Sequence, residues 1–183
     1  MKKISTVLLL AVAIISLMAV TCHRDKKDGL NFEKIYKEDI EKVTKKYNTE
    51  DVQLYAVYGC LNKAFEEIID ENIDINEIYF TDIYTIFQVG DKVVQVSHNG
   101  IFDTINEYED SYWADSYKIN IPDNIITADS ALKNYLAQSD TVVPGNIIVL
   151  RSPFEMNDSL NCYYLFGYDS VYTIMNAKGV IVK

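Results

Sequence analysis

IYTIFQVGDKVVQVS, residues 83–97, is the stretch that decides the fold. Both of its arms are rich in β-branched and aromatic residues, which favour strands. The arms flank Gly90-Asp91, a dipeptide suited to a tight turn. The stretch therefore predicts a hairpin of two antiparallel strands, closed by the second turn dipeptide Asn99-Gly100.

Upstream of the hairpin the pattern changes to helical spacing. Residues 31–47, NFEKIYKEDIEKVTKKY, place their apolar side chains on one stripe with lysines and carboxylates opposite, which predicts an amphipathic helix. A second helix is expected from Val52 to about Asp70, with Thr49 as its cap, although VQLYAVYGC at its start also has the composition of a strand. A further strand is predicted at residues 75–80, INEIYF.

Downstream of the hairpin, residues 103–124 are predicted to be mostly loop. Residues 126–140, ITADSALKNYLAQSD, show helical spacing behind a capping Thr127. Three strand-like segments complete the chain: residues 146–154, 162–169 and 171–182.

Runs of helix and runs of strand without regular alternation predict an α+β fold. We expect N-terminal helices and one helix of the C-terminal half to pack on antiparallel sheet. Both halves read as helix followed by strands, so two similar halves are an open alternative, although no fixed-period repeat is visible. Residues 31–183 are expected to form a single domain.

The N-terminus has the pattern of a signal peptide. Lys2 and Lys3 precede an apolar run from Ile4 to Val20, which is short for a permanent membrane span. Residues 1–21 are therefore predicted to be a cleaved leader that directs export.

At the end of this leader, AVTC (residues 19–22) resembles the lipobox of bacterial lipoproteins. That resemblance implies lipidation of Cys22, cleavage before it, and a location in the cell envelope, at the outer membrane or cell surface rather than the inner membrane. Residues 22–30 would then be a flexible tether, and the lipid would be the only contact with the membrane. The alternative is ordinary cleavage that leaves Cys22 a plain thiol.

The C-terminal third resembles the PepSY domain. The match consists of Ile126, Thr127, Ala131 and Leu132 at a helix start, then Gly179 with Val180 and Ile181 after three strands, and it covers residues 125–183. PepSY-like domains occur in envelope proteins and in protease propeptides that restrain an enzyme, so the resemblance implies a binding or inhibitory module and supplies no catalytic residue.

The charge balance favours some partners over others. The formal net charge is −10, and the segment from Phe65 to Asp129 holds 15 acidic residues against Lys92 and Lys118. Nucleic-acid binding depends on basic patches, so this balance argues against it. The acidic segment indicates either a solvated surface or a face that attracts a basic protein partner.

The richest candidate for binding is EYEDSYWADSY, residues 107–117. Tyrosine and tryptophan are enriched at interface hot spots, and neighbouring carboxylates would select a basic partner. The alternative is that these aromatic side chains fold inward over the sheet. The predicted binding residues are Tyr108, Glu109, Asp110, Tyr112, Trp113, Asp115 and Tyr117.

Catalytic and metal-binding patterns are weak by comparison. Cys60 and Cys162 could form a disulfide after export or stay as free thiols. His23 and His98 have no partners at metal-ligand spacing, and His98 is predicted to be a polar turn residue rather than a catalytic base. We therefore expect no metal and no cofactor, and a noncatalytic, membrane-tethered binding protein. The alternative is a lipoprotein that binds carbohydrate or another small ligand through the same aromatic side chains.

Overall fold

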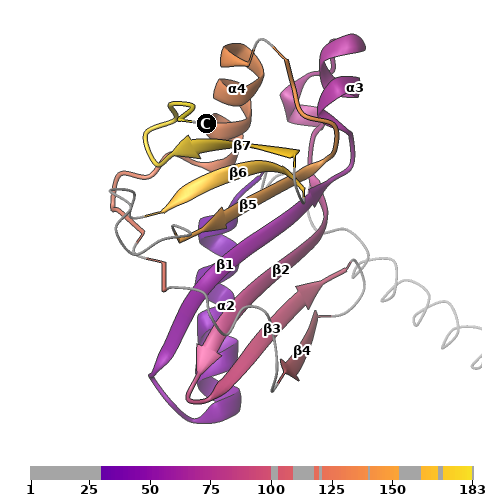
Figure 1. The fold of residues 1–183 in the computed structure, drawn as a ribbon. Helices are drawn as coiled ribbons and strands as arrows, with labels where there is room; N and C mark the ends of the chain where they lie inside the picture. The colour runs from indigo at the N-terminus through magenta and orange to yellow at the C-terminus, as the bar shows by residue number, and fades with distance from the viewer. Residues whose placement is uncertain are drawn as a thin grey trace, which may run out of the picture.

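The computed structural model describes residues 30–99, 103–108, 118–119, 121–139, 141–152, 162–168 and 171–182. Helices and strands follow one another in two runs along the chain (Figure 1). The elements are α2 (Phe32–Tyr47), β1 (Val52–Leu61), α3 (Phe65–Asp70), the 3₁₀ turn η2 (Ile75–Glu77), β2 (Phe80–Val89), β3 (Lys92–His98), β4 (Asp103–Tyr108), α4 (Ala128–Gln138), β5 (Ile147–Arg151), β6 (Tyr163–Tyr168) and β7 (Val171–Asn176).

All of these strands belong to one antiparallel sheet with the order β4-β3-β2-β1-β5-β6-β7. The first strand of each run, β1 and β5, pair at the centre, where Tyr58 lies opposite Val149. Each later strand is added on the outside of its own run (Figure 1). The α+β fold predicted from the sequence is confirmed, and both halves have the order of a helix followed by antiparallel strands.

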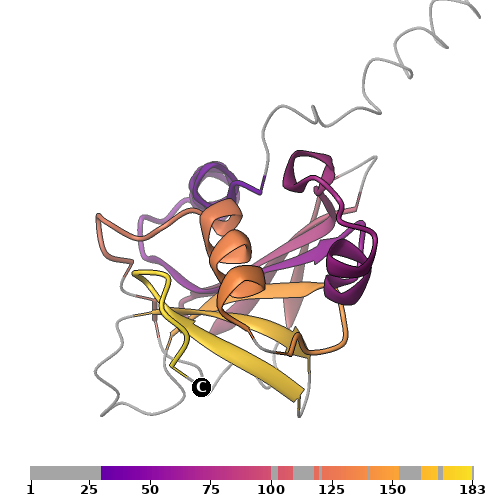
Figure 2. The ribbon, with the colours of Figure 1, turned by 90° about the horizontal axis from the view of Figure 1, so that it is seen from above.

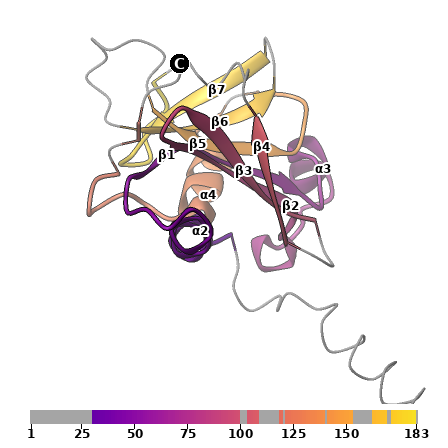
Figure 3. The same cartoon turned by 90° about the horizontal axis from the view of Figure 1, so that it is seen from below.

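The helices lie on one side of this sheet. Figure 2 shows α2 and α4 on the same face, and Figure 3 shows this arrangement from below, with α2 seen end-on beside the strands. Buried residues of α2, α3 and α4 join the sheet in one hydrophobic core. The opposite face, which carries none of the described helices, has a second, smaller apolar cluster, and we call it the helix-free face. In the part of the chain that the structure describes, no helix has the length and apolar character to cross a membrane.

Helix α2 begins and ends as its sequence predicts. The Asn31 side chain accepts a hydrogen bond from the Lys34 backbone N–H, and Asn48 ends the helix in the left-handed conformation. Its first core residue, Phe32, stacks on Phe80 of β2 with ring centroids 4.8 Å apart. This contact fixes the start of α2 against the sheet.

Helix α4 confirms the prediction for residues 126–140. Thr127 caps it through a hydrogen bond from the Ser130 backbone N–H. Tyr135 is fully buried, stacks on Phe166 of β6 at 4.3 Å and accepts a hydrogen bond from the Val143 backbone N–H at 2.7 Å. The helix is thereby held against the second half of the sheet.

The helix predicted from Val52 to Asp70 is wrong. Its first part is strand β1, which pairs with β2 on one side and β5 on the other, and only Phe65–Asp70 is helical. Both faces of β1 meet apolar neighbours: Leu54 and Val57 lie in the core under the helices, whereas Tyr55 and Ala56 lie in the cluster of the helix-free face. A strand buried on both faces loses the polar alternation that would identify it.

The hairpin of residues 83–97 is confirmed as β2 and β3, with Gly90 at φ 62° in the turn. The strand predicted for residues 75–80 is wrong, because this segment holds η2 and only Phe80 belongs to β2. Asp74 stabilises the turn by accepting the Asn76 backbone N–H at 2.9 Å, which the strand prediction ignored.

Strand β4 corrects the prediction of a loop for residues 103–124. It pairs with β3 in full register, yet five of its six residues are exposed and have polar side-chain atoms, and only Ile105 is aliphatic. Polar side chains of α2 attach it instead: Lys42 contacts Asp103 at 2.6 Å, Lys46 donates to the Ile105 carbonyl at 3.3 Å, and the Tyr47 hydroxyl donates to Glu107 at 2.8 Å. The strand therefore has no apolar pattern to detect.

The three C-terminal strands are confirmed as β5, β6 and β7. After β7 the chain bends at Gly179, which has φ 82°, and Ile181 bridges back to Met175. The Val182 backbone N–H donates to the Ile174 carbonyl at 2.8 Å. Residues 180–182 thus run beside the outer edge of β7.

Candidate functional site

The helix-free face carries a straight row of side chains across all seven strands. Because directly paired residues in an antiparallel sheet point to the same face, the register defines the row from β4 to β7. Its members are Thr104, Ser97, Tyr84, Tyr58, Val149, Leu165 and Ile174. We call this set the cross-sheet row. It is polar and aromatic on the first half of the sheet and aliphatic on the second.

Two tyrosines form the centre of the cross-sheet row. The rings of Tyr58 and Tyr84 meet edge to face, with centroids 6.0 Å apart and planes at 71°. Burial raises the pKa of Tyr84, and the carboxylate of Asp82 raises it further, so the phenol stays protonated. Both side chains are half-buried, and their exposed parts can contact a partner through the ring and the hydroxyl group.

Further tyrosines surround this pair on the same face. Tyr108 of β4 lies opposite Val93 and is 42% exposed. Tyr55 and Tyr163 are buried within the apolar cluster, and Tyr172 is half-buried against it. A large share of the tyrosine content thus lies on one face, which sequence spacing alone could not reveal because the strands that carry it are far apart in the chain.

Of the predicted binding residues, the structure describes only Tyr108, which is exposed at the end of β4. Cys22 and the other predicted binding residues lie outside the described residues: Glu109, Asp110, Tyr112, Trp113, Asp115 and Tyr117. Their predicted roles therefore stay predictions.

Cys60 and Cys162 are free thiols. Cys60 pairs with Ile147 at one end of β5, whereas Cys162 precedes Tyr163, which pairs with Arg151 at the other end. The four residue steps from Ile147 to Arg151 on β5 correspond to about 13 Å, well beyond the reach of a disulfide. Burial raises the pKa of Cys162 to about 11, so this thiol is unreactive near neutral pH.

The acidic residues of the middle segment fall into two groups. On β4, Asp103 and Glu107 are paired with lysines, including Lys92 at 2.6 Å from Glu107. Around α3 and η2 the carboxylates are exposed, and they lie beside the exposed apolar side chains of Ile69 and Tyr79. This second group consists of Glu66, Glu67, Asp70, Glu71, Asp74 and Glu77. Lys63 approaches Glu67 and Glu71 at 3.8 and 4.0 Å, so most of the group's negative charge faces solvent.

His98 is not the polar turn residue that the sequence predicted. It ends β3, is 3% exposed, and points to the helix-covered face, where both of its nitrogens meet carboxylates. Ser97 points to the helix-free face and accepts a hydrogen bond from Gln95, so the two neighbours lie on opposite sides of the sheet. They do not form a nucleophile–base pair. Among the residues that the structure describes, no group of three His, Cys, Asp or Glu side chains is placed to hold a metal.

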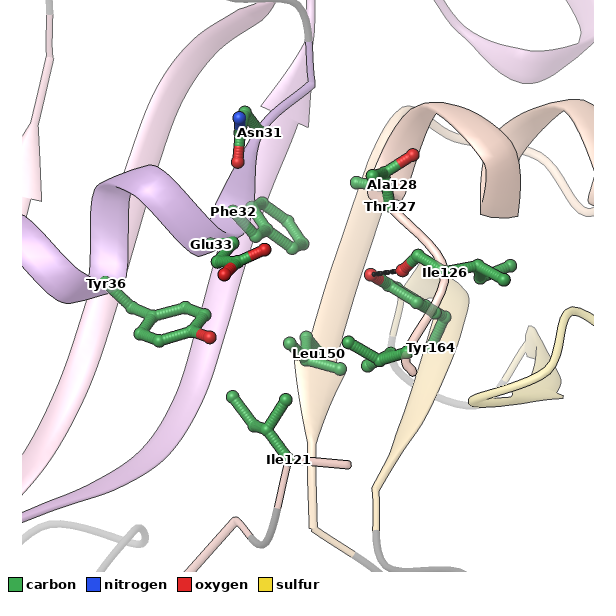
Figure 4. Close-up of a pocket in the computed structure, with 11 residues that line it drawn as sticks. Asn31, Phe32, Glu33, Tyr36, Ile121, Ile126, Thr127, Ala128, Leu150 and Tyr164 are labelled. Carbon is green, nitrogen blue, oxygen red and sulfur yellow. Dashed lines mark hydrogen bonds between the residues drawn. The ribbon is translucent and has the colours of Figure 1, made fainter. Parts of the chain in front are cut away.

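A small pocket lies where the N-terminal ends of α2 and α4 approach each other (Figure 4). Its floor is formed by Phe32 and Leu150, and the Tyr164 hydroxyl donates to the Ile126 carbonyl at 2.7 Å beside it. Burial raises the pKa of Tyr36 at its rim, and Glu33 raises it further. The pocket encloses about 20 Å³, which is room for about one water molecule rather than a sugar.

Comparison with known proteins gives one result. Neither a family model nor a curated protein sequence matches the chain. Among solved structures, the chain is similar to a protein from Clostridium difficile 630 that is described as a "putative lipoprotein". The similarity has a TM-score of 0.46 at 14% sequence identity and covers 81% of this chain and 90% of the other. A similarity at this level carries no functional information.

Proposed function

We propose that the chain is an exported lipoprotein, held at a bacterial envelope membrane through Cys22, whose folded part is a noncatalytic module that binds a basic protein partner. The leader pattern and the lipobox-like AVTC support the anchor. The described residues begin at Leu30, the last residue of the segment expected to be the tether.

The observation that carries the binding proposal is the one-sided sheet. With the helices on one face, the other face carries the cross-sheet row, in which Ser97, Val149 and Leu165 are buried. The edge-to-face pair of Tyr58 and Tyr84 at its centre is half-buried and offers the contact area. Tyrosines contribute large contact area with a polar tip and little conformational freedom to lose on binding, which suits a broad protein interface.

Charge supports a basic partner. The formal net charge is −10, and the exposed carboxylates around α3 leave most of their charge unpaired. The negative electrostatic potential of this surface accelerates the encounter with a positively charged protein and repels acidic proteins. The resemblance of residues 125–183 to the PepSY domain adds the proposal that the partner is an enzyme that this module restrains.

Among the described residues, a small-ligand role has less support, because the pocket between α2 and α4 encloses about 20 Å³, far below the size of a typical small-molecule site. An enzymatic role also lacks a site among the described residues, since Ser97 and His98 point to opposite faces.

Capture from envelope extracts tests the proposal. The bait is the full chain, compared with Tyr108→Arg and Thr104→Arg, which add positive charge at exposed positions of the helix-free face. We expect both variants to lose the captured protein, because a basic partner would be repelled. Ala137→Arg is the matched control, since Ala137 is exposed on α4, on the opposite side of the sheet.

The deciding measurement is the amount of protein captured by each variant. Circular dichroism shows that each variant is folded. Equal capture by Tyr108→Arg, Thr104→Arg and the control would remove the helix-free face from the proposal. Mass spectrometry of the mature N-terminus tests the anchor separately: a diacylglyceryl-modified Cys22 is expected, and an unmodified thiol would exclude the lipoprotein.

A further inference from the structure

Four titratable side chains from α2, β3 and β4 contact one another in a ring of polar interactions. His98 Nε2 lies 2.7 Å from Asp39 Oδ2, and His98 Nδ1 lies 2.6 Å from Asp103 Oδ1. Lys42 closes the ring at 2.6 Å from Asp103 Oδ2 and 3.2 Å from Asp39 Oδ1. We call these four residues the His98 cluster.

The hydrogen-bond pattern of the His98 cluster fits a charged imidazole between two ionised carboxylates. Ionised carboxylates only accept, and a neutral imidazole has one N–H and one lone pair. With a neutral His98, one nitrogen lone pair would face a carboxylate oxygen at 2.6 or 2.7 Å. With both nitrogens protonated, each contact is a charge-assisted hydrogen bond, and two positive charges balance two negative ones.

The groups around the cluster add further donors to the same carboxylates. From β2, the Thr85 hydroxyl donates to Asp39 Oδ2 at 2.7 Å and so adds a further donor to that carboxylate. Burial lowers the pKa of Lys42, but the contacts with Asp103 and Asp39 outweigh it and the pKa is raised, so Lys42 stays charged. Asp39 is fully buried and His98 is 3% exposed, so water does not replace a lost contact. A buried charge that loses its partner is strongly destabilising.

The elements joined by the cluster depend on it to different degrees. Strand β4 lies at the edge of the sheet and contributes only Ile105 as an aliphatic residue, so polar contacts with α2 and β3 hold it. The central strands are held by their apolar packing on both faces. Loss of one charge in the cluster therefore acts first on β4 and on the C-terminal half of α2.

From this geometry we infer that the His98 cluster is a proton-dependent latch. It holds β4 and α2 together while His98 carries both protons, and it opens when His98 loses one. The latch stays closed while the imidazole carries both protons and the two carboxylates are ionised, and it opens when the imidazole becomes neutral.

Nuclear magnetic resonance can observe this proton directly. In the full chain carrying His23→Gln, in detergent micelles, His98 is the only histidine. We expect its two ¹⁵N shifts to report protonation of both nitrogens at about pH 6. As the pH rises and His98 titrates, amide protection factors in β4 and the second half of α2 should fall at least tenfold, while those in β1 and β5 change little.

Two variants decide the outcome. In His98→Gln, the pH-dependent loss of protection in β4 should be absent, because no proton is left to lose. If that variant does not fold, Lys42→Met serves instead: removing a positive charge beside the two carboxylates should make His98 keep its proton to a higher pH. A His98 with a single protonated nitrogen at about pH 6, or β4 protection that does not follow the His98 titration, would overturn the latch.

Discussion

Gly59 is the residue at which β1 has no room for a side chain. A Cβ atom added there would lie 2.3 Å from a ring carbon of Phe80. The Phe80 ring has little freedom to retreat, because it stacks on Phe32 at 4.8 Å. The same three residues therefore fix the distance between the start of α2 and the centre of the sheet.

Gly59→Ala is expected to destabilise the protein by about 1–3 kcal/mol, the usual cost of overpacking a core. Urea denaturation followed by circular dichroism measures this loss as a lower midpoint. Adding Phe80→Leu to Gly59→Ala should recover part of it, since the smaller side chain makes room for the new methyl group. A double variant whose destabilisation equals the sum of the two single ones would contradict this account.

Burial of individual polar residues could not be predicted from the sequence. His98 stands before Asn99 and Gly100, a context typical of a turn, and its burial depends on Asp39 from α2 and Asp103 from β4. Those partners are distant in the chain and come together only once the sheet and α2 have packed. Thr127 is the opposite case: its hydrogen-bond partner, Ser130, is three residues away, so the sequence predicted the cap correctly.

At the scale of elements, local periodicity predicted α2, α4, the β2–β3 hairpin and the three C-terminal strands. It failed for β1, which is buried on both faces, and for β4, whose stability depends on polar contacts with α2. Both strands are stabilised by residues from distant parts of the chain. The spacing of residues within each strand therefore does not reveal these contacts.

The contacts that attach β4 to α2 and β3 should also depend on pH in the acidic range. Burial raises the pKa of Asp103, but hydrogen bonds from Lys42 and His98 outweigh it, so the pKa lies below its usual value. A carboxyl group with a depressed pKa contributes stability above its unfolded pKa of about 4, and this stability is lost as the pH falls through the folded pKa.

Asp103→Asn should therefore flatten the decline in stability below about pH 4. Urea midpoints measured from about pH 5 down to about pH 2 cover the range in which an ion-paired aspartate is titrated. A variant with the same acid slope as the wild-type protein would show that Asp103 contributes nothing to the pH dependence.

At the scale of the whole molecule, the two halves share one core. Phe32 of the first half stacks on Phe80 of the same half and on Tyr164 of the second, with the latter centroids 6.5 Å apart. The pairing of β1 with β5 makes the sheet continuous between the halves. Neither half can be exposed to water without uncovering the apolar side chains of the other.

We therefore expect the folded part to unfold in a single transition. Calorimetry should give equal calorimetric and van't Hoff enthalpies, the criterion for two-state behaviour. Two separate heat-absorption peaks, or a calorimetric enthalpy well above the van't Hoff value, would show that the halves unfold independently.

The candidate binding site illustrates what sequence can and cannot give at this scale. The segment EYEDSYWADSY predicted an aromatic binding surface; its one described tyrosine, Tyr108, is exposed, and the binding role stays a prediction. The pair of Tyr58 and Tyr84 was missed, because VQLYAVYGC was placed in a helix and the register between β1 and β2 could not be known.

The short bridge of residues 180–182 beside β7 has a consequence for how such a protein can evolve. The first half follows its helix with four strands, whereas the second has three and this bridge in the position of a fourth. Because the sheet is extended only at its margins, a lineage can gain or lose terminal segments there while the central pair of strands is inherited unchanged.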